Sequence, residues 1–188
     1  MFDSPYPLRK AARNTGLSPG LIEHVFTFDD DEGRRYLLLV EEYPHSVYAV
    51  KFHLKVHRNA ANRFSILTGY GHSPRILATV LSAMLIFYQK DELASFVYIG
   101  APRIGEDKAN TKRFQLYQLV MQTVFPASLF SYNHVDEESL TLILNIDHAL
   151  RNPELVEQIK GLYERYVGEK EEWVSSFFGL RWVGAKVA

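Results

Sequence analysis

The amino-acid sequence predicts an α+β fold, with an antiparallel meander sheet, crossover helices, a C-terminal hairpin and further C-terminal helices. Three observations support this prediction. Residues 48–57 alternate strictly between two sets of side chains, which is the period of a strand with one buried face. Residues 108–123 carry apolar side chains at spacings of three and four, as an amphipathic helix does. Residues 128–133 and 139–146 flank an acidic turn and predict a hairpin.

The first half of the chain predicts four strands after an irregular start. Clustered prolines and glycines in residues 1–20 favour an irregular arm or a short helix. Strands are expected over 24–28, 34–43, 48–57 and 63–70, because each is bounded by turn-forming residues. Together they form a four-stranded antiparallel meander with one buried face.

The second half predicts helices around one more strand and the hairpin. Ser73 is a good N-cap and Pro74 suits the first helical position, so a helix is expected over 75–89. A strand over 95–99 follows, and a helix with Leu155, Ile159 and Leu162 on one stripe begins near residue 152. The predicted domain organisation is an arm (1–22), an α+β domain (23–150) and a helical extension packed on it (151–188).

Composition excludes several classes of protein. The 188 residues are 47% hydrophobic and 23% charged, as expected for a globular chain. The formal net charge of −1 provides no global attraction to nucleic acid or to anionic membranes. Cysteine is absent, so disulfides and thiolate chemistry are excluded. The longest apolar stretch is too short to span a bilayer and the start does not read as a signal peptide, so we expect a cytoplasmic protein without a membrane.

One helical motif resembles the N-acetyltransferase (GNAT) superfamily. The predicted second helix contains Asn110, followed six and seven residues later by Leu116 and Tyr117. The same spacing occurs in that family, and the order of meander, helix, strand, helix and hairpin over residues 24–146 is similar. The resemblance implies a cofactor cleft where the fourth and fifth strands splay apart. It also implies Tyr117 as the general acid that protonates the departing thiolate.

The family places a Q/R-x-x-G-x-G/A loop before the helix that follows the fourth strand, where backbone N–H groups meet the pyrophosphate of acetyl-CoA. In this chain Arg75 and Leu77 stand at the two glycine positions, so no cofactor is expected. The alternative is acetyl-CoA bound by an atypical loop, and the resemblance implies these candidate cofactor-binding residues: Gly69, Gly71, His72, Ser73, Arg75 and Asn110.

A second resemblance concerns residues 96–99 and 111–117. Phe96-Val97-Tyr98-Ile99 and the later run from Thr111 to Tyr117 look like a group of small uncharacterised bacterial proteins. This resemblance supports the fold and implies no activity.

Basic side chains share one face of the alternating strand. Lys51, His53, Lys55 and His57 lie on that face and Arg58 follows, so an anion or a nucleic acid could bind there. The competing interpretation is a solvated sheet face paired with Glu41 and Glu42, and on this interpretation we expect no nucleic-acid binding. His53 and His57 would lie roughly 13 Å apart on a strand, too far to share a metal.

No metal site is expected from the sequence. The remaining histidines lack ligand spacing, and the Asp29–Glu32 run lacks the alternating ligands of a calcium loop. Four large aromatic side chains near the C-terminus either pack on the domain or form a homodimer or partner contact: Trp173, Phe177, Phe178 and Trp182.

Three functions are therefore open. The first is an acetyltransferase-like domain without a standard acetyl-CoA site, acting through binding or protein contacts. The second is an active N-acyltransferase with an atypical phosphate loop and Tyr117 as acid. The third is an anion or nucleic-acid binding module that uses the Lys51–Arg58 strand face.

Overall fold

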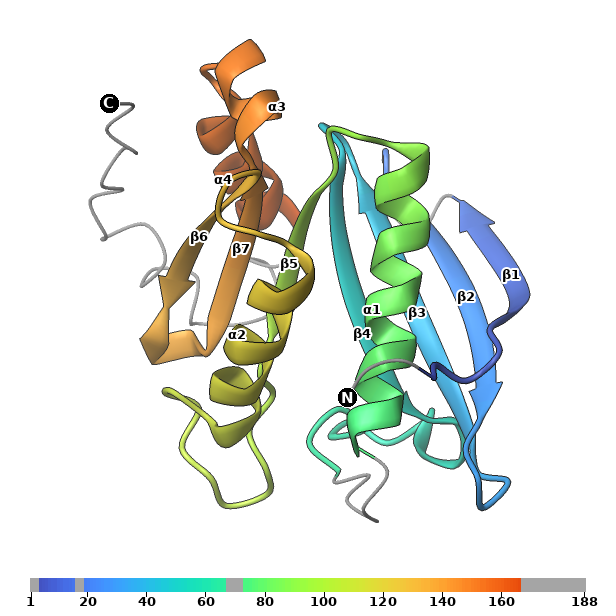
Figure 1. Ribbon diagram of the computed structural model, residues 1–188. Helices are drawn as coiled ribbons and strands as arrows, with labels where there is room; N and C mark the ends of the chain where they lie inside the picture. The colour runs from blue at the N-terminus through green and yellow to red at the C-terminus, as the bar shows by residue number, and fades with distance from the viewer. Residues whose placement is uncertain (1–3, 16–18, 67–72, 167–188) are drawn as a thin grey trace.

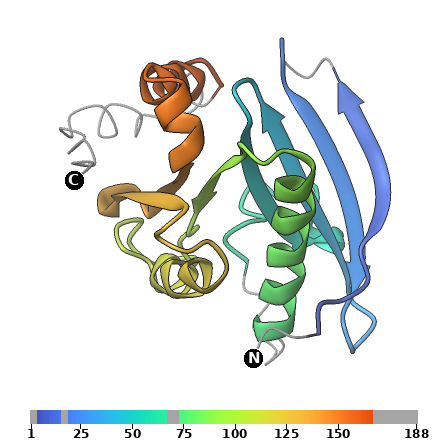
Figure 2. The ribbon, with the colours of Figure 1, turned by 45° about the horizontal axis from the view of Figure 1, so that its top comes forward.

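The computed structural model describes residues 4–15, 19–66 and 73–166. These ranges contain one seven-stranded sheet in the order β1-β2-β3-β4-β5-β7-β6, with helices on both faces (Figures 1 and 2). The elements are β1 (Arg9–Thr15), β2 (Ile22–Asp29), β3 (Arg35–Tyr43), β4 (Val47–Leu54), η1 (Lys55–His57), α1 (Ser73–Lys90), β5 (Ser95–Ile99), α2 (Lys112–Val124), β6 (Phe130–Val135), η2 (Asp136–Glu138), β7 (Leu140–Asn145), α3 (Ile146–Arg151) and α4 (Leu155–Tyr166). The predicted α+β class and the hairpin are confirmed.

The meander has four antiparallel strands, but they are β1 to β4 rather than the four predicted ones. The expectation of an irregular arm or a short helix is wrong for residues 9–15, which pair with β2 along the edge of the sheet. Six of the seven β1 residues are exposed. A strand exposed on both faces shows no apolar alternation, so its sequence does not reveal it.

The segment after β4 also differs from the prediction. β4 ends at Leu54 and residues 55–57 form a 3₁₀ turn, so the strand expected over 48–57 is three residues too long. The strand expected over 63–70 is wrong for residues 63–66, which form turns, and residues 67–70 lie outside the described ranges. Backbone bonds of the i→i+3 type fold this segment back on itself, including Arg63 N–H to Ala60 O at 3.2 Å.

The two halves of the sheet meet at β4 and β5, its one parallel pair within the described residues. A parallel pair needs a long crossover, and α1 supplies it. Register partners run from Val47–Ser95 to Ala49–Val97. β4 then continues to Leu54 and β5 to Ile99 without further pairing, and the strands diverge in Figure 1.

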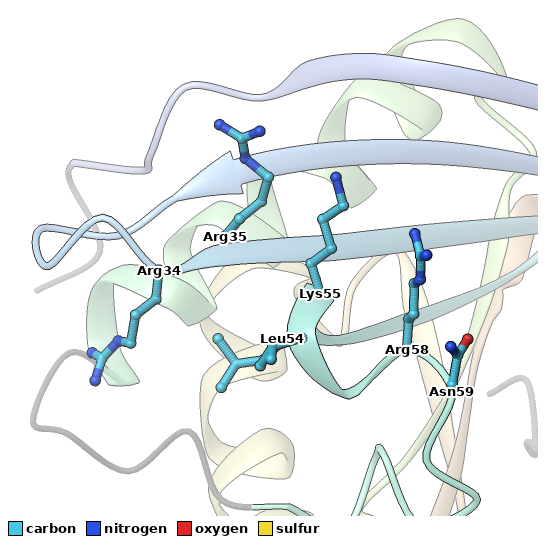
Figure 3. A pocket seen from close by; sticks show the side chains of 7 residues that line it. Arg34, Arg35, Leu54, Lys55, Arg58 and Asn59 are labelled. Carbon is cyan, nitrogen blue, oxygen red and sulfur yellow. The ribbon is translucent and has the colours of Figure 1, made fainter.

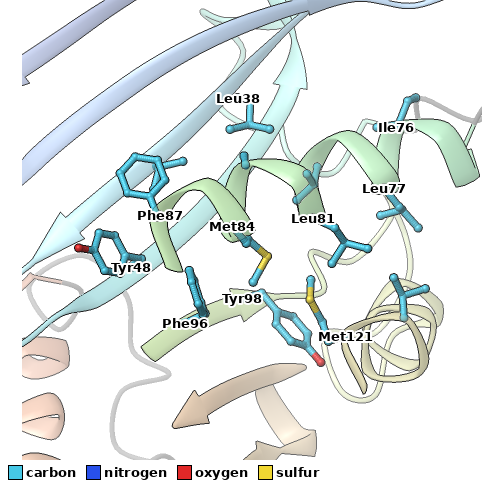
Figure 4. Close-up of a cluster of buried hydrophobic side chains, with 14 of the residues drawn as sticks. Leu38, Tyr48, Ile76, Leu77, Leu81, Met84, Phe87, Phe96, Tyr98 and Met121 are labelled. Carbon is cyan, nitrogen blue, oxygen red and sulfur yellow. The ribbon is translucent and has the colours of Figure 1, made fainter. Parts of the chain in front are cut away.

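The main core lies between the sheet and α1 and α2 (Figure 4). Ile76, Ala83 and Met84 of α1 are each 1% exposed, because the helix lies across the even-numbered side chains of β3 and β4. No helix within the described residues is both long and apolar enough to cross a bilayer.

A second, smaller core lies on the opposite face of the sheet. Leu155, Ile159 and Leu162 of α4 pack on Val47 of β4 and on Leu142 and Leu144 of β7. The stripe predicted for this helix is therefore its buried face. Residues 167–188, the rest of the predicted C-terminal extension, lie outside the described ranges.

The start of α2 shows how tightly β5 and the helix meet. The sequence predicted a start near residue 108, but α2 begins at Lys112 because Thr111 is its N-cap. The Thr111 hydroxyl accepts a hydrogen bond from Phe114 N–H at 3.1 Å and donates one to Gly100 O at 2.6 Å. A Cβ at Gly100 would lie 2.4 Å from the Phe114 nitrogen, so only glycine fits at the end of β5.

We predict opposite effects for the same substitution at two glycines. Gly100→Ala should lower the free energy of unfolding by about 1–3 kcal/mol, because the helix backbone must move away from the strand. Gly161→Ala, the matched control inside α4, meets nothing within 4 Å. It should raise stability by about 0.5–1 kcal/mol through the greater helix propensity of alanine. Urea denaturation followed by circular dichroism measures both, and an unchanged Gly100→Ala protein would contradict the close contact.

Candidate functional site

The divergence of β4 and β5 is the place where the resemblance puts a cofactor. Tyr117 lies on α2, partly buried against the main core. Its ring meets that of Tyr98 from β5 edge-on, with 5.8 Å between centroids. Burial raises the pKa of Tyr117, so the phenol stays protonated at neutral pH. A general acid must be protonated, but any buried tyrosine is protonated as well. The protonation of Tyr117 is therefore consistent with both a catalytic and a purely structural role.

Tyr98 of β5 is buried, with 5% of its surface exposed. Burial raises its pKa to about 12, against a smaller lowering effect of the Thr141 hydroxyl on the neighbouring strand. The Tyr98 hydroxyl has no hydrogen-bond partner within 3.5 Å among the described residues. Thr141 itself is engaged by His134, whose Nδ1 lies 2.8 Å from the threonine hydroxyl.

Arg113 lies one helical turn before Tyr117 and connects α2 to the segment that follows η1. Its guanidinium donates hydrogen bonds to the carbonyl oxygens of Phe64, Ser65 and Ile66. The bond to Ile66 is 3.2 Å long. Arg113 thus joins α2 to residues 64–66.

The first turn of α1 carries two of the residues on which the cofactor prediction depends. The Arg75 guanidinium pairs with Asp31 at 2.6 Å, donates to Ser4 O at 2.8 Å and lies 4.1 Å from the ring centroid of Tyr6. Leu77 is 6% exposed in the main core. Both side chains are therefore used in holding α1 to the rest of the fold.

The remaining predicted cofactor residues are not brought together within the described ranges. Gly69, Gly71 and His72 lie outside those ranges, and Ser73 is the first residue of α1. Asn110 is exposed on a turn with φ of 48°, and its backbone and side-chain oxygens accept bonds from Gln115. The capping role at α2 belongs to the next residue, Thr111.

The residues of the predicted basic strand face lie in different environments in the structure. Lys51 pairs with Glu41 at 2.7 Å, as the competing interpretation expected. His53 is 4% exposed, its Nδ1 lies 2.9 Å from Leu54 O, and its ring meets Phe64 edge-on. Burial lowers the pKa of His53, so it is neutral at pH 7 and cannot attract an anion. The prediction that it shares a solvated face with Lys51 is wrong.

Lys55, His57 and Arg58 fall beyond the end of β4. Because η1 turns the chain at this point, Lys55 and His57 do not continue the strand face, which corrects that prediction. Lys55 and Arg58 instead line an open hollow of about 650 Å³, together with Arg34, Arg35, Leu54, Val56 and Asn59. In Figure 3 the side chains of Arg35, Lys55 and Arg58 point the same way, while Arg34 turns away from them.

Sequence reasoning missed Arg34, which precedes β3, and Arg35, the first residue of β3. Tyr36 is the register partner of Leu54, so Arg34 and Arg35 come beside the end of β4. The predicted turn at residues 44–46 fixes this register, and counting back from it would have found the pair. The distance in sequence between Arg35 and Lys55 concealed their proximity.

The acidic turn before β3 is neutralised by arginines. Four acids pair with four arginines as follows: Asp29 with Arg9 and Arg35, Asp30 and Glu32 with Arg34, and Asp31 with Arg75. Asp30 is enclosed, with a side chain 0% exposed. Burial alone would raise the pKa of Asp30, but hydrogen bonds from Arg34 and Glu32 lower it. Within the described ranges no three side chains could hold a metal ion together.

Comparisons with protein-family models, curated proteins and solved structures find no match to this chain.

The ion pairs of Asp29 predict an acid-sensitive stability. Hydrogen bonds from Arg35 and then Arg9 lower the pKa of Asp29 from 3.8 to about 2. A carboxylate with a depressed pKa stabilises the fold above its unfolded value, and this contribution is lost as the pH falls from about 4 to 2. Asp29→Asn should therefore flatten the fall of the free energy of unfolding across that window.

Glu137→Gln is the control, because Glu137 is exposed on η2 and should leave the pH profile of the wild type unchanged. Urea titrations between pH 2 and pH 6 measure both variants. If the free energy of unfolding fell as steeply with falling pH in Asp29→Asn as in the wild type, the assigned role of Asp29 would be contradicted.

Proposed function

We propose that this protein is a binding domain built on an acetyltransferase-like scaffold, rather than an enzyme that transfers an acyl group. Support for the scaffold comes from the order of the elements and from the β4–β5 pair. Its strands run parallel, pair over three residues and then diverge, as the resemblance implies for the fourth and fifth strands, although the fourth strand is Val47–Leu54 and not the predicted 63–70. We thus propose both a GNAT-like fold and the absence of acyl transfer.

The observation that carries the proposal is the engagement of Arg75 and Leu77. A pyrophosphate cradle needs bare backbone N–H groups, because a Cβ prevents close approach. Arg75 joins α1 to Ser4, Asp31 and Tyr6, and Leu77 is part of the main core. Freeing these positions for a cofactor would break those contacts, so the start of α1 serves stability in our proposal.

An active N-acyltransferase is the second candidate, favoured by one observation on α2. Tyr117 is kept protonated by burial, and Arg113 places a guanidinium one turn away with no carboxylate partner among the described residues. An acid and a cation on adjacent turns suit a leaving thiolate. Acetyl-CoA would be the substrate, with Tyr117 as its general acid.

Contacts between proteins remain a prediction. The four aromatic residues proposed for a homodimer or partner contact, Trp173, Phe177, Phe178 and Trp182, lie outside the described ranges. Nucleic-acid binding through the original strand face loses support, because Lys51 is paired and His53 is buried.

We predict that acetyl-CoA does not stabilise the protein. A specific ligand at 100 times its Kd adds about 2.7 kcal/mol to the free energy of unfolding, which a thermal-shift assay detects. We expect no such shift with acetyl-CoA at millimolar concentration beyond any shift that pyrophosphate gives at the same concentration. Tyr117→Phe should behave as the wild type does in the same assay, because the phenol has no role in our proposal.

A shift of that size that acetyl-CoA gives and pyrophosphate does not would overturn the proposal. Acetyl transfer to small amines, measured by thiol release and lost in Tyr117→Phe, would then establish the second candidate instead.

A further inference from the structure

We propose that the hollow at the end of β4 binds the phosphate group of a small phosphorylated molecule, with Arg35, Lys55 and Arg58 as the anion-binding residues. This inference rests on the proposed binding function and names the class of ligand and its site. It concerns the opposite end of β4 from the paired segment that joins β5, and it uses no residue of α1 or α2.

The first argument for a phosphate site is the net charge around the hollow. The four acids of residues 29–32 are balanced by four arginines, so this group of side chains contributes no net charge. Lys55 and Arg58 have no acidic partner among the described residues. They therefore give the hollow a net charge of about +2, which complements a phosphate group of about −1.5 to −2 at neutral pH.

The second argument is that the guanidinium of Arg35 is held in a fixed orientation. Asp29 holds its Nε at 2.8 Å and its Nη2 at 3.1 Å, in the two-pronged geometry that fixes a guanidinium plane. The Nη1 group of Arg35 has no hydrogen-bond partner among the described residues. An arginine oriented in advance in this way binds with less loss of side-chain entropy. In Figure 3 its tip and those of Lys55 and Arg58 point the same way.

The lining of the hollow favours a small molecule over a nucleic acid. Its volume of about 650 Å³ falls in the range of small-molecule sites. Leu54 and Val56 supply an apolar part, and Val56 is 80% exposed. No aromatic side chain lines the hollow within the described residues, so nothing there could stack on a base.

The experiment is a titration followed by amide NMR shifts, with inorganic phosphate and pyrophosphate as probes at constant ionic strength. We expect saturable shifts centred on residues 34–35 and 54–59. The double variant Lys55→Gln/Arg58→Gln should weaken pyrophosphate binding by about tenfold or more, because it removes two charge-assisted contacts. The control Arg103→Gln/Lys112→Gln removes two exposed cations elsewhere and should bind as the wild type does.

Three outcomes would overturn the inference. One is equal weakening in both double variants, which would mean that only overall charge matters. Another is shifts that avoid residues 34–35 and 54–59. The last is much tighter binding of a 20-nucleotide single strand than of pyrophosphate, with an affinity that falls steeply as salt is added. That result would indicate a nucleic-acid surface.

The same spectra separate this inference from the proposed function. Shifts from acetyl-CoA centred on residues 73–79 and 113–117, with the hollow undisturbed, would refute the proposed function and leave the phosphate site standing. If pyrophosphate shifted no amide signals of the residues that line the hollow, and acetyl-CoA shifted none at residues 73–79 and 113–117, only the phosphate site would be refuted.

Discussion

The parallel pairing of β4 and β5 is the constraint on which the rest of the structure depends. Three register pairs join the two halves of the sheet, and Ala49 and Val97 are 48 residues apart in the chain. Loop closure of that length costs conformational entropy, which the crossover helix offsets by burying one apolar face against both halves. Tyr48 and Phe96 contribute rings from the two sides of the junction, with centroids 5.9 Å apart. The divergence beyond the paired residues follows from the same arrangement.

The sequence predicted most of the elements that bury one face, and it missed β1, which buries none, and the short helix α3. The helices over 75–89 and 108–123 and the hairpin were found because periodicity and turn residues mark them. β1 was missed because its side chains are exposed on both faces. The alternation of residues 48–57 continued past the true end of β4, since a local pattern carries no information about the 3₁₀ turn at Lys55.

The candidate sites depended still more on tertiary contacts. Nothing near Arg75 in the chain indicates its bond to Ser4, which lies 71 residues away. His53 has the polar periodicity of Lys51 but is covered by Phe64, a contact that requires the later segment to fold back. The basic hollow combines residues from β3 and η1 that become neighbours through the hairpin register. Composition could show that basic residues exist, but only the fold shows which of them are balanced by acids.

The edge strand β1 bears on how the protein behaves at high concentration. An open edge presents unpaired backbone groups on which a second chain could add a strand. Here the edge carries Arg9, Lys10 and Arg13, and its register shifts between Lys10 and Ala12. Two such edges brought together would place like charges opposite each other along an irregular ladder. At this edge of the sheet, the basic side chains and the irregular register therefore oppose the addition of a second copy.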